Sequence, residues 1–312
     1  MIKLFSGTAN KPLSDKIAAL INIPIAQSEI VRFENSEIRI RIEEDVRYKT
    51  CVLLQSTSNP TDTHLMELFF FCDALRRQEA QKVIGVIPYF GYARQDIQHR
   101  PGECISANVI IKFLESIGFY KVYTINLHDE ATEGVFSIPF KNMDAFPLLA
   151  REIQTYLGKN TATVDQVAVV SPDHGGVERA RKFSDTFFGS NRHTIAVVEK
   201  KRDLQHIHES HALDLYGDVN GKIAILVDDM TTSGKTLVNA SRLCLERGAK
   251  RVLTAVVHHD FAPDITARLQ DSPIEAFFTT DTILLQDDQR FNKLHEVSVA
   301  QLIADELRHL TK

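Results

Sequence analysis

The chain has 312 residues, which is long for a single hydrophobic core and sufficient for two domains. Its composition, 44% apolar and 25% charged, is that of an ordinary globular protein. The formal net charge of -5 argues against nucleic acid as the main partner, because nucleic-acid binders need a net basic face.

The sequence predicts neither a membrane-spanning segment nor a signal peptide. No stretch approaches the roughly 20 consecutive apolar residues that cross a membrane, and the first residues lack the apolar run of a signal peptide. The cysteines, Cys51, Cys72, Cys104 and Cys244, are scattered without CxxC spacing, which predicts neither structural zinc nor a disulfide framework. We therefore expect a cytoplasmic protein with no nucleic-acid or membrane partner.

Helical and strand-like stretches alternate along the chain. Helical spacing of apolar residues predicts helices, and nearly continuous apolar runs predict strands buried on both faces, as in parallel sheets. In chain order these are a helix over 63–77, a strand over 82–87, a helix over 106–116, a strand over 121–125, a helix over 145–156, strands over 167–171 and 223–228, a helix over 236–247, a strand over 251–257 and a helix over 297–310. The alternation predicts an α/β fold.

The alternating pattern occurs twice, which predicts two domains. We expect an N-terminal domain over residues 1–142 and a C-terminal domain over residues 143–296, with a final helix at about 297–312 that can return to the first domain. Each domain is expected to be a mostly parallel sheet flanked by helices. Ligands of such sheets bind beyond the carboxyl ends of the strands, and the motifs below fall at such ends.

The strand over 223–228 ends in two acids, Asp228 and Asp229. The loop that follows is rich in hydroxyl groups and contains one glycine and one lysine: Thr231, Thr232, Ser233, Gly234, Lys235 and Thr236. Backbone N–H groups of a tight loop at a helix N-terminus bind anions, and a glycine lets the backbone approach a phosphate. Carboxylates are good acceptors for sugar hydroxyls. The segment therefore predicts a site for a phosphorylated ribose.

Two other interpretations of this segment are weaker. A helix N-cap after a buried strand explains a threonine or a serine, but not two consecutive acids. A Walker A phosphate loop requires a glycine five positions before Gly234, where Asp229 stands, so the segment does not predict a P-loop nucleotidase.

Several further motifs occur in a fixed order with this loop. They are LFSGTAN at 4–10, LMEL at 65–68, PYFGYARQD at 88–96 and SPD at 171–173. In this order they resemble the ribose-phosphate pyrophosphokinase family, which has the type I phosphoribosyltransferase fold, and the resemblance extends over essentially the whole chain. The resemblance implies two phosphoribosyltransferase-like domains, ATP and ribose 5-phosphate as substrates, Mg²⁺ as cofactor, and self-association at least to a dimer, with hexamers common.

The resemblance also implies a nucleotide site. In the family, the segment matching 88–96 binds ATP, so Arg94, Gln95 and Asp96 are expected there; an arginine pairs with phosphate oxygens in a fork. A neighbouring subunit supplies a second segment to the adenine, here Phe33, Asn35 and Glu37.

The adenine segment departs from the family pattern. Asn35 stands in place of an aspartate and Ser36 in place of a glycine, and an amide both donates and accepts hydrogen bonds, whereas a carboxylate only accepts. A short edge strand is the alternative interpretation of this segment.

The metal and catalytic groups are implied in the same way. His128 and Asp173 match the family's magnesium-linked positions, although Asn126 stands where relatives carry an acid. Lys200 and Arg202 match a lysine and an arginine on a loop that closes over the reacting phosphates. Cations there stabilise the charge on the transferred group. A solvated charge run is the alternative for these residues.

Two rival functions stay open. A phosphoribosyltransferase that consumes 5-phosphoribosyl 1-pyrophosphate (PRPP) shares the sugar loop but does not need the segments at 33–37 and 88–96. A non-catalytic regulatory paralogue of the synthetase is expected to lose catalytic cations and metal ligands, and this chain retains them. The phosphate loop itself departs from the family at Thr232, usually an acid, and at Lys235, usually a small residue.

Overall fold

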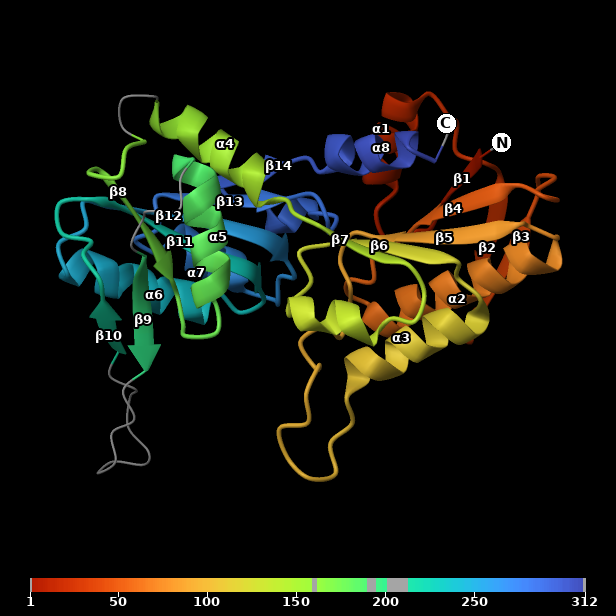
Figure 1. Ribbon diagram of the computed structural model, residues 1–312, viewed down its shortest axis with the longest axis horizontal. Coiled ribbons are helices and arrows are strands. Elements are labelled where there is room, and N and C mark those ends of the chain that lie inside the picture. Colours follow the sequence, from red (N-terminus) through yellow and green to blue (C-terminus); the bar gives the residue numbers. More distant parts are fainter. Residues whose placement is uncertain (1, 159–161, 190–194, 201–212, 311–312) are drawn as a thin grey trace. The chain divides into compact units, whose positions relative to one another are not determined.

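A computed structural model of the chain describes residues 2–158, 162–189, 195–200 and 213–310 (Figure 1). The chain divides into two compact units. Unit 1 comprises Met1–Asp144, Thr282–Leu284 and Ser298–Lys312, and unit 2 comprises Ala145–Asp281 and Leu285–Val297. None of the helices in the described part of the chain combines the length and the apolar character that a bilayer crossing requires.

Unit 1 is built on a fully parallel sheet of five strands. In spatial order these are β1 (Ile2–Ser6), β4 (Thr50–Leu54), β5 (Lys82–Ile87), β6 (Lys121–Ile125) and β7 (Phe140–Met143). The residues of β4 and β5 are almost all buried because helices cover both faces of the sheet, which explains the continuous apolar runs in the sequence.

The helices of unit 1 are α1 (Lys11–Ile21), α2 (Thr61–Arg77), α3 (Ser106–Ile117), the short 3₁₀ helix η1 (Glu130–Val135) and α8 (Ala300–Arg308). Figure 1 shows α2 and α3 along one side of the sheet, with α1 and α8 beside the other. Phe71 and Leu68 of α2 and Leu114 of α3 are fully buried in a cluster with the sheet. A separate antiparallel hairpin is formed by β2 (Ser28–Arg32) and β3 (Ile38–Ile42).

The last helix of the chain completes unit 1. Helix α8 packs against α1, and the Arg308 guanidinium donates to the carbonyl oxygen of Leu20 at 2.8 Å. Thr282–Leu284, which the sequence places within the second half, also belongs to unit 1, and the Ser56 hydroxyl donates to the carbonyl oxygen of Thr282.

Unit 2 contains a sheet of seven strands. In spatial order these are β10 (Leu213–Tyr216), β9 (Ala196–Lys200), β8 (Val167–Ser171), β11 (Ile223–Thr231), β12 (Arg251–His259), β13 (Ala276–Thr280) and β14 (Leu294–Val297). Only the β9–β10 pair among them is antiparallel. The predicted α/β class, with mostly parallel sheets flanked by helices, is therefore confirmed.

The helices of unit 2 are α4 (Phe146–Leu157), α5 (Val177–Phe188), α6 (Lys235–Glu246), the short α7 (Ile265–Gln270) and the 3₁₀ helix η2 (Asp287–Gln289). Helices α4 and α5 pack against each other, with Phe146 and Phe183 in edge-to-face contact at 5.7 Å between ring centroids. Helices α6 and α7 bury Leu237 and Ile265 with Leu226 of β11 and Val256 of β12 in one cluster.

The boundaries of three predicted elements differ from those in the structure. The helix expected over 297–310 begins three residues later, at Ala300, because Val297 closes β14 by pairing with Thr280 of β13. The strands predicted over 223–228 and 251–257 are longer than expected, since β11 and β12 continue pairing as far as Thr231 and His259.

Candidate active site

Acidic side chains gather at the carboxyl ends of two adjacent strands of unit 2, β8 and β11. Asp173 follows β8, and Asp228 and Asp229 lie near the end of β11. Arg179 of α5 pairs with both acids of β11: its Nη1 lies 2.8 Å from Asp228 Oδ1 and its Nη2 lies 2.9 Å from Asp229 Oδ1. One guanidinium therefore bridges two consecutive carboxylates.

The turn between β8 and α5 places Asp173 and Arg179. The Ser171 hydroxyl donates to the carbonyl oxygen of Asp173 at 2.6 Å, and the backbone N–H of Gly176 donates to Asp173 Oδ1 at 3.1 Å. A Cβ atom at Gly176 would lie 2.8 Å from Ser171 Oγ and 3.3 Å from Arg179 Nη1. The glycine therefore leaves the space that the hydroxyl and the guanidinium occupy.

Burial changes the electrostatics of this group. It raises the pKa of Asp228 well above its usual range, the adjacent charge of Asp229 raises it further, and Asp173 adds a smaller effect in the same direction. The positive charge of Arg179 opposes the rise in the pKa of Asp228. The backbone N–H of Asp229 also donates to Asp228 Oδ1, at 2.9 Å. The acids are thus held close together by a cation that offsets their repulsion.

The hydroxyl-rich loop leads from β11 into α6. Gly234 caps α6 with a backbone φ of +69° and makes no side-chain hydrogen bond at the cap. The Ser233 hydroxyl accepts from the backbone N–H of Lys235, the first residue of α6, at 3.5 Å. A helix N-terminus without a side-chain cap presents N–H donors and a positive dipole end to an anion. The loop predicted to bind a phosphate therefore leads into a helix N-terminus, and the phosphate site itself stays a prediction.

Helix α7 supports the outside of this loop. A Cβ atom at Gly234 would lie 3.2 Å from Ile265 Cγ1, and Arg268 donates to the carbonyl oxygen of Ser233. The backbone N–H of Ala262 donates to the carbonyl oxygen of Thr232 at 2.9 Å. These contacts hold the loop on the side of α7. They are not predictable from the sequence, because α7 is short and lies about 30 residues further along the chain.

The loop's side chains differ in their surroundings. Thr231 is buried and pairs in register with His259 of β12, whereas Ser233, Lys235 and Thr236 are exposed. The Thr232 hydroxyl oxygen is buried and has no hydrogen-bond partner among the described residues. Buried hydroxyls without a partner are uncommon, and such a group in a loop fits a donor or acceptor that a ligand completes.

In unit 1, the segment predicted to bind ATP follows β5. Gln95 is tied to the start of α3: its Oε1 accepts from the Ser106 hydroxyl at 2.6 Å, and its carbonyl oxygen accepts from the N–H of Ala107 at 3.1 Å. Arg94 is exposed and forms no hydrogen bond or ion pair with the described residues, and Asp96 is half-buried. The segment therefore offers a free guanidinium on an anchored turn.

The adenine segment is the turn of the β2–β3 hairpin rather than an edge strand. Its backbone closes through the N–H of Phe33 and the carbonyl oxygen of Glu37 at 2.8 Å. Asn35 Oδ1 accepts from the N–H of Glu37 at 3.2 Å, and Ser36 adopts a φ of +69°, in the left-handed region that favours glycine. The Phe33 ring is 43% exposed and lies below the Arg39 guanidinium, 5.8 Å from its centroid. Phe33 is thus available for stacking by another molecule.

His128 lies beyond the carboxyl end of β6, after a bend at Asn126, whose φ is +40°. The Asn126 amide donates to Asp144 Oδ1 at 2.9 Å. A carboxylate at position 126 has no proton to donate at neutral pH, so this contact depends on the amide. Asp129 is occupied in a different way, because its carboxylate accepts from the N–H of Ala131 and caps η1.

The predicted metal and catalytic groups are distributed over both units. His128 belongs to unit 1 and Asp173 to unit 2. Within the described ranges, no three His, Cys, Asp or Glu side chains lie close enough together to hold a metal ion. Lys200 is the last residue of β9, its side chain is not described, and Arg202 lies outside the described residues.

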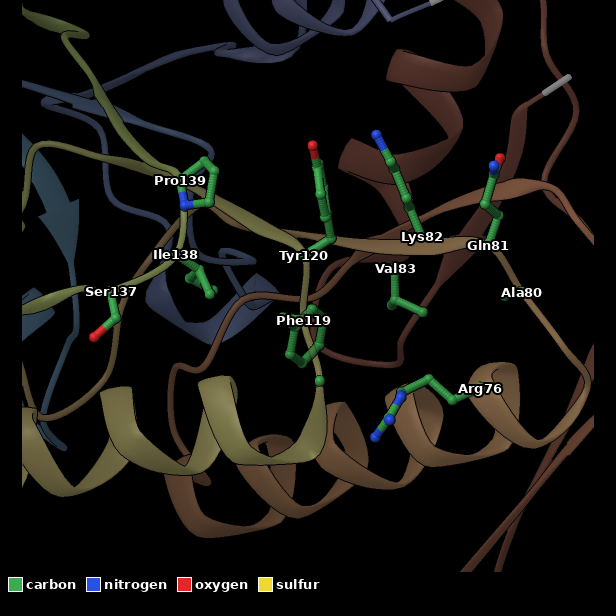
Figure 2. A pocket seen from close by; sticks show the side chains of 11 residues that line it. Arg76, Ala80, Gln81, Lys82, Val83, Phe119, Tyr120, Ser137, Ile138 and Pro139 are labelled. Carbon is green, nitrogen blue, oxygen red and sulfur yellow. The ribbon is translucent and has the colours of Figure 1, made fainter.

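A cavity of about 410 Å³ lies elsewhere in unit 1, beside the amino ends of β5 and β6 (Figure 2). Lys82 and Tyr120 rise on one side of these strands, with Lys82 Nζ 4.0 Å from the Tyr120 ring centroid, whereas Val83 points toward α2. Arg76, the other cation of the lining, lies on α2 and donates to the carbonyl oxygen of Ile117 at 2.6 Å. The two cations do not converge, so the cavity is not a second phosphate site.

Two family models match the chain. Residues 2–118 match the N-terminal domain of ribose phosphate pyrophosphokinase, and residues 166–312 match the phosphoribosyl synthetase-associated domain. A ribose-phosphate pyrophosphokinase of Fusobacterium nucleatum is 37% identical over 310 residues, covering 99% of this chain and 95% of that protein. Ribose-phosphate pyrophosphokinase 2 of Enterococcus faecalis is 36% identical and covers 99% and 93%.

A solved structure agrees with these relatives. The phosphoribosylpyrophosphate synthetase of Mycobacterium smegmatis has a TM-score of 0.91 and 32% identity, with 99% of this chain and 98% of that chain covered. The similarity extends over both units and all the motifs that suggested it. The chain therefore belongs to the ribose-phosphate pyrophosphokinase family of enzymes.

Proposed function

We propose that the chain is a cytoplasmic enzyme that makes PRPP by transferring the βγ-diphosphoryl group of ATP to the C1 hydroxyl of ribose 5-phosphate, releasing AMP. The observation that carries this proposal is an arrangement within unit 2: two carboxylates bridged by Arg179, followed along the chain by the N-terminus of α6, where a glycine occupies the N-cap. Sugar hydroxyls suit the first, and a phosphate suits the second.

The sugar phosphate is bound along β11 and its loop. The 5-phosphate accepts from backbone N–H groups at Gly234 and the start of α6, with the hydroxyls of Thr231, Thr232, Ser233 and Thr236 and the ammonium of Lys235 around it. The 2- and 3-hydroxyls donate to Asp228 and Asp229. This pose places the C1 hydroxyl at the strand ends, where ligands of parallel sheets bind.

ATP is bound by unit 1 and by a second copy of the chain. Arg94 forks onto phosphate oxygens, and Gln95 and Asp96 orient the nucleotide. Phe33 of another copy stacks on the adenine, with Asn35 and Glu37 at its polar edge. The exposed Phe33 ring supports this role, because it has an open face within its own chain. The proposal includes self-association, as a dimer at least and as a hexamer by analogy with the family.

Mg²⁺ fits the donors that the chain offers. This ion keeps several waters and is commonly held by one or two carboxylates together with substrate phosphates, so it needs no cluster of three protein ligands. Asp173, whose Oδ1 is oriented by Gly176, and His128 are the residues proposed to hold it. When bound, Mg²⁺ neutralises phosphate charge; the chain's own residues position the two substrates.

The reaction is a displacement at the β-phosphorus of ATP. The C1 oxygen forms a bond to that phosphorus and loses its proton, while the bond to the oxygen between the α- and β-phosphorus atoms breaks and AMP departs with that oxygen. Lys200 and Arg202 stabilise the charge on the non-bridging oxygens. Positioning and charge stabilisation account for the catalysis without a dedicated general base.

A single assay tests the proposal. Purified protein with Mg²⁺, ATP and ribose 5-phosphate is expected to yield AMP and PRPP in equal amounts, measured by chromatography of the nucleotides and of PRPP. Transfer of a nucleobase to supplied PRPP, with no AMP formed from ATP, identifies the PRPP-consuming rival instead. Absence of both reactions, together with an altered rate of an active synthetase on mixing, identifies a regulatory paralogue.

A further inference from the structure

The bridge made by Arg179 is the best-defined polar contact of the sugar site. Its Nη1 and Nη2 reach Asp228 Oδ1 and Asp229 Oδ1 at 2.8 Å and 2.9 Å. The three side chains are 16%, 17% and 4% exposed, so solvent screens the contacts little. Arg179 comes from a different element, α5, and therefore fixes β11 from outside the strand.

A planar guanidinium suits this place for a geometric reason. Its Nη1 and Nη2 atoms donate in fixed directions and can serve two carboxylates at once, whereas a lysine ammonium is a compact point charge on a flexible stem. Two adjacent buried carboxylates repel each other, and a third acid, Asp173, lies near Asp228. One rigid cation both offsets this repulsion and sets the angle between the two carboxylates.

We infer that Arg179 is a positioning residue that sets Asp228 and Asp229 to receive the two hydroxyls of a vicinal diol, and thereby makes the site select ribose 5-phosphate over its 2-deoxy counterpart. This inference rests on the proposed function. Arg179 acts through the carboxylates and is assigned no contact with the reacting atoms. The bridge holds both carboxylates in place before the sugar binds. A sugar that lacks one hydroxyl therefore leaves one carboxylate without a hydroxyl donor.

The surrounding turn reserves space for this bridge. Because a Cβ atom at Gly176 would lie 3.3 Å from Arg179 Nη1 and 2.8 Å from Ser171 Oγ, even an alanine displaces the guanidinium or its neighbour. Gly176 has a φ of -87°, which any residue adopts, so an alanine there acts through crowding and not through backbone strain. A substitution at position 176 therefore disturbs the bridge without removing the positive charge of Arg179.

The experiment compares Arg179→Lys with Arg181→Lys. Arg181 lies on the same helix, its side chain is 62% exposed, and among the described residues it pairs with Glu178 at 3.8 Å, so its replacement controls for general effects on α5. Arg179→Lys is expected to raise the KM for ribose 5-phosphate about 10- to 100-fold, the range for a lost hydrogen bond to a charged group, and to leave the KM for ATP unchanged. Arg181→Lys is expected to match the wild type.

Substrate discrimination is the second measurement. The wild-type ratio of kcat/KM for ribose 5-phosphate to that for 2-deoxyribose 5-phosphate is expected to fall about 10-fold or more in Arg179→Lys, because the diol is no longer held at two fixed acceptors. Calorimetric titration with each sugar phosphate, without ATP, is expected to show that the ratio of the two affinities is also smaller in Arg179→Lys than in the wild type. A variant that keeps the wild-type KM and the wild-type ratio overturns the inference.

If Arg179→Lys fails to fold, Gly176→Ala still tests the positioning role of Arg179. Crowding of the guanidinium is expected to raise the KM for ribose 5-phosphate while the KM for ATP stays at the wild-type value. Equal KM values in Gly176→Ala and the wild type contradict the positioning role. If the wild type itself makes no AMP and no PRPP, the proposed function fails; if it is active and both variants match it, only the role of Arg179 fails.

Discussion

Gly234 is the residue on which the shape of the phosphate loop depends. Its φ of +69° lies in the left-handed region, and the space beside it is filled by Ile265 and Leu269 of α7. We expect Gly234→Ala to lower the free energy of unfolding by about 1–3 kcal/mol for the backbone alone, with a further loss from crowding. The KM for ribose 5-phosphate is expected to rise, since the loop moves.

Gly189 provides the matched control for this change. It has a φ of +75° at the end of α5, and an added Cβ atom would have no atom of the described residues beyond its chain neighbours within 4 Å. Gly189→Ala therefore measures backbone strain without crowding. Urea unfolding of the two variants is expected to show the larger loss for Gly234→Ala, and equal losses would show that α7 does not support the loop.

Lys200 and Arg202 carry the prediction about catalysis. Lys200→Ala and Arg202→Ala are each expected to lower kcat by about 100- to 1000-fold, as the loss of one charge-stabilising contact does elsewhere, while the unfolding midpoint stays unchanged. Lys11→Ala, which removes an exposed cation paired with Asp15 at 2.9 Å, is the control. Near-normal turnover in both variants would rule out the catalytic role.

The residue types of the sugar site could be predicted, but the contacts that hold them could not. Two consecutive acids and a hydroxyl loop after an apolar run are local signals, and the structure places them where a parallel sheet binds ligands. Arg179 lies 49 positions before Asp228, so its bridge depends on the pairing of β8 with β11. The sequence signal for this bridge is an arginine, Arg179, in the first turn of the helix that follows Gly175 and Gly176.

At the scale of whole elements, a cluster of three side chains joins α4 to two strands. Arg251 Nε, at the start of β12, donates to Glu275 Oε2 at 2.6 Å, and the Tyr156 hydroxyl of α4 donates to Glu275 Oε1 at 2.9 Å. The hydrogen bond from Arg251 is the main reason why the pKa of Glu275 is lowered, and burial opposes this shift. The cluster couples the position of α4 to an ionised carboxylate.

This cluster predicts a pH dependence of stability. A carboxylate whose pKa is lowered by folding stabilises the protein above its unfolded pKa, and that contribution is lost as the pH falls through the folded value. Starting from the ordinary pKa of 4.5, the loss therefore begins below about pH 4.5. In urea unfolding, Glu275→Gln is expected to be less stable than the wild type near about pH 7 and to converge with it near about pH 3. A gap that does not change with pH would show that ionisation is irrelevant.

The prediction of elements from sequence succeeded where burial was two-sided. Continuous apolar runs such as 82–87 and 167–171 coincide with β5 and β8, because helices cover both faces of each sheet. The end of β14 was assigned to a helix, because Val297 fits either pattern and only its pairing with Thr280 decides. The segment at 33–37 is too short for its pattern to distinguish a nucleotide-binding turn from an edge strand.

Over the whole molecule, each unit has a hydrophobic core of its own. The core of unit 1 also depends on α8, in which Leu307 is 2% exposed. We expect Leu307→Ala to lower the free energy of unfolding of unit 1 by about 2–5 kcal/mol, the usual cost of such a cavity. Gln301→Ala on the exposed side of α8 is the control.

Differential scanning calorimetry can assign this effect to one unit. If the two cores unfold separately, Leu307→Ala is expected to shift only the transition of unit 1, which limited proteolysis can identify by cleavage within residues 2–144. A shift of both transitions by the same amount would show that the two units unfold together.

The repeated strand–helix pattern predicts two domains, but it does not predict the path of the chain between the two compact units. The short stretch Thr282–Leu284 is part of unit 1, although unit 2 resumes at Leu285. Nothing in a three-residue segment marks such a return, because its place is decided by contacts such as that of Ser56 with Thr282. The comparison with relatives over nearly the full length settles the family without resolving this detail.

The return of α8 to unit 1 has a consequence for the order of events on the ribosome. Ser298–Lys312 belongs to unit 1 and is synthesised after unit 2. Unit 2 can therefore fold before α8 has been synthesised and unit 1 can be completed. During that interval the part of α1 that packs against α8 is exposed to chaperones and to other nascent chains. Newly made chains stalled before residue 298 should therefore be the ones that chaperones retain.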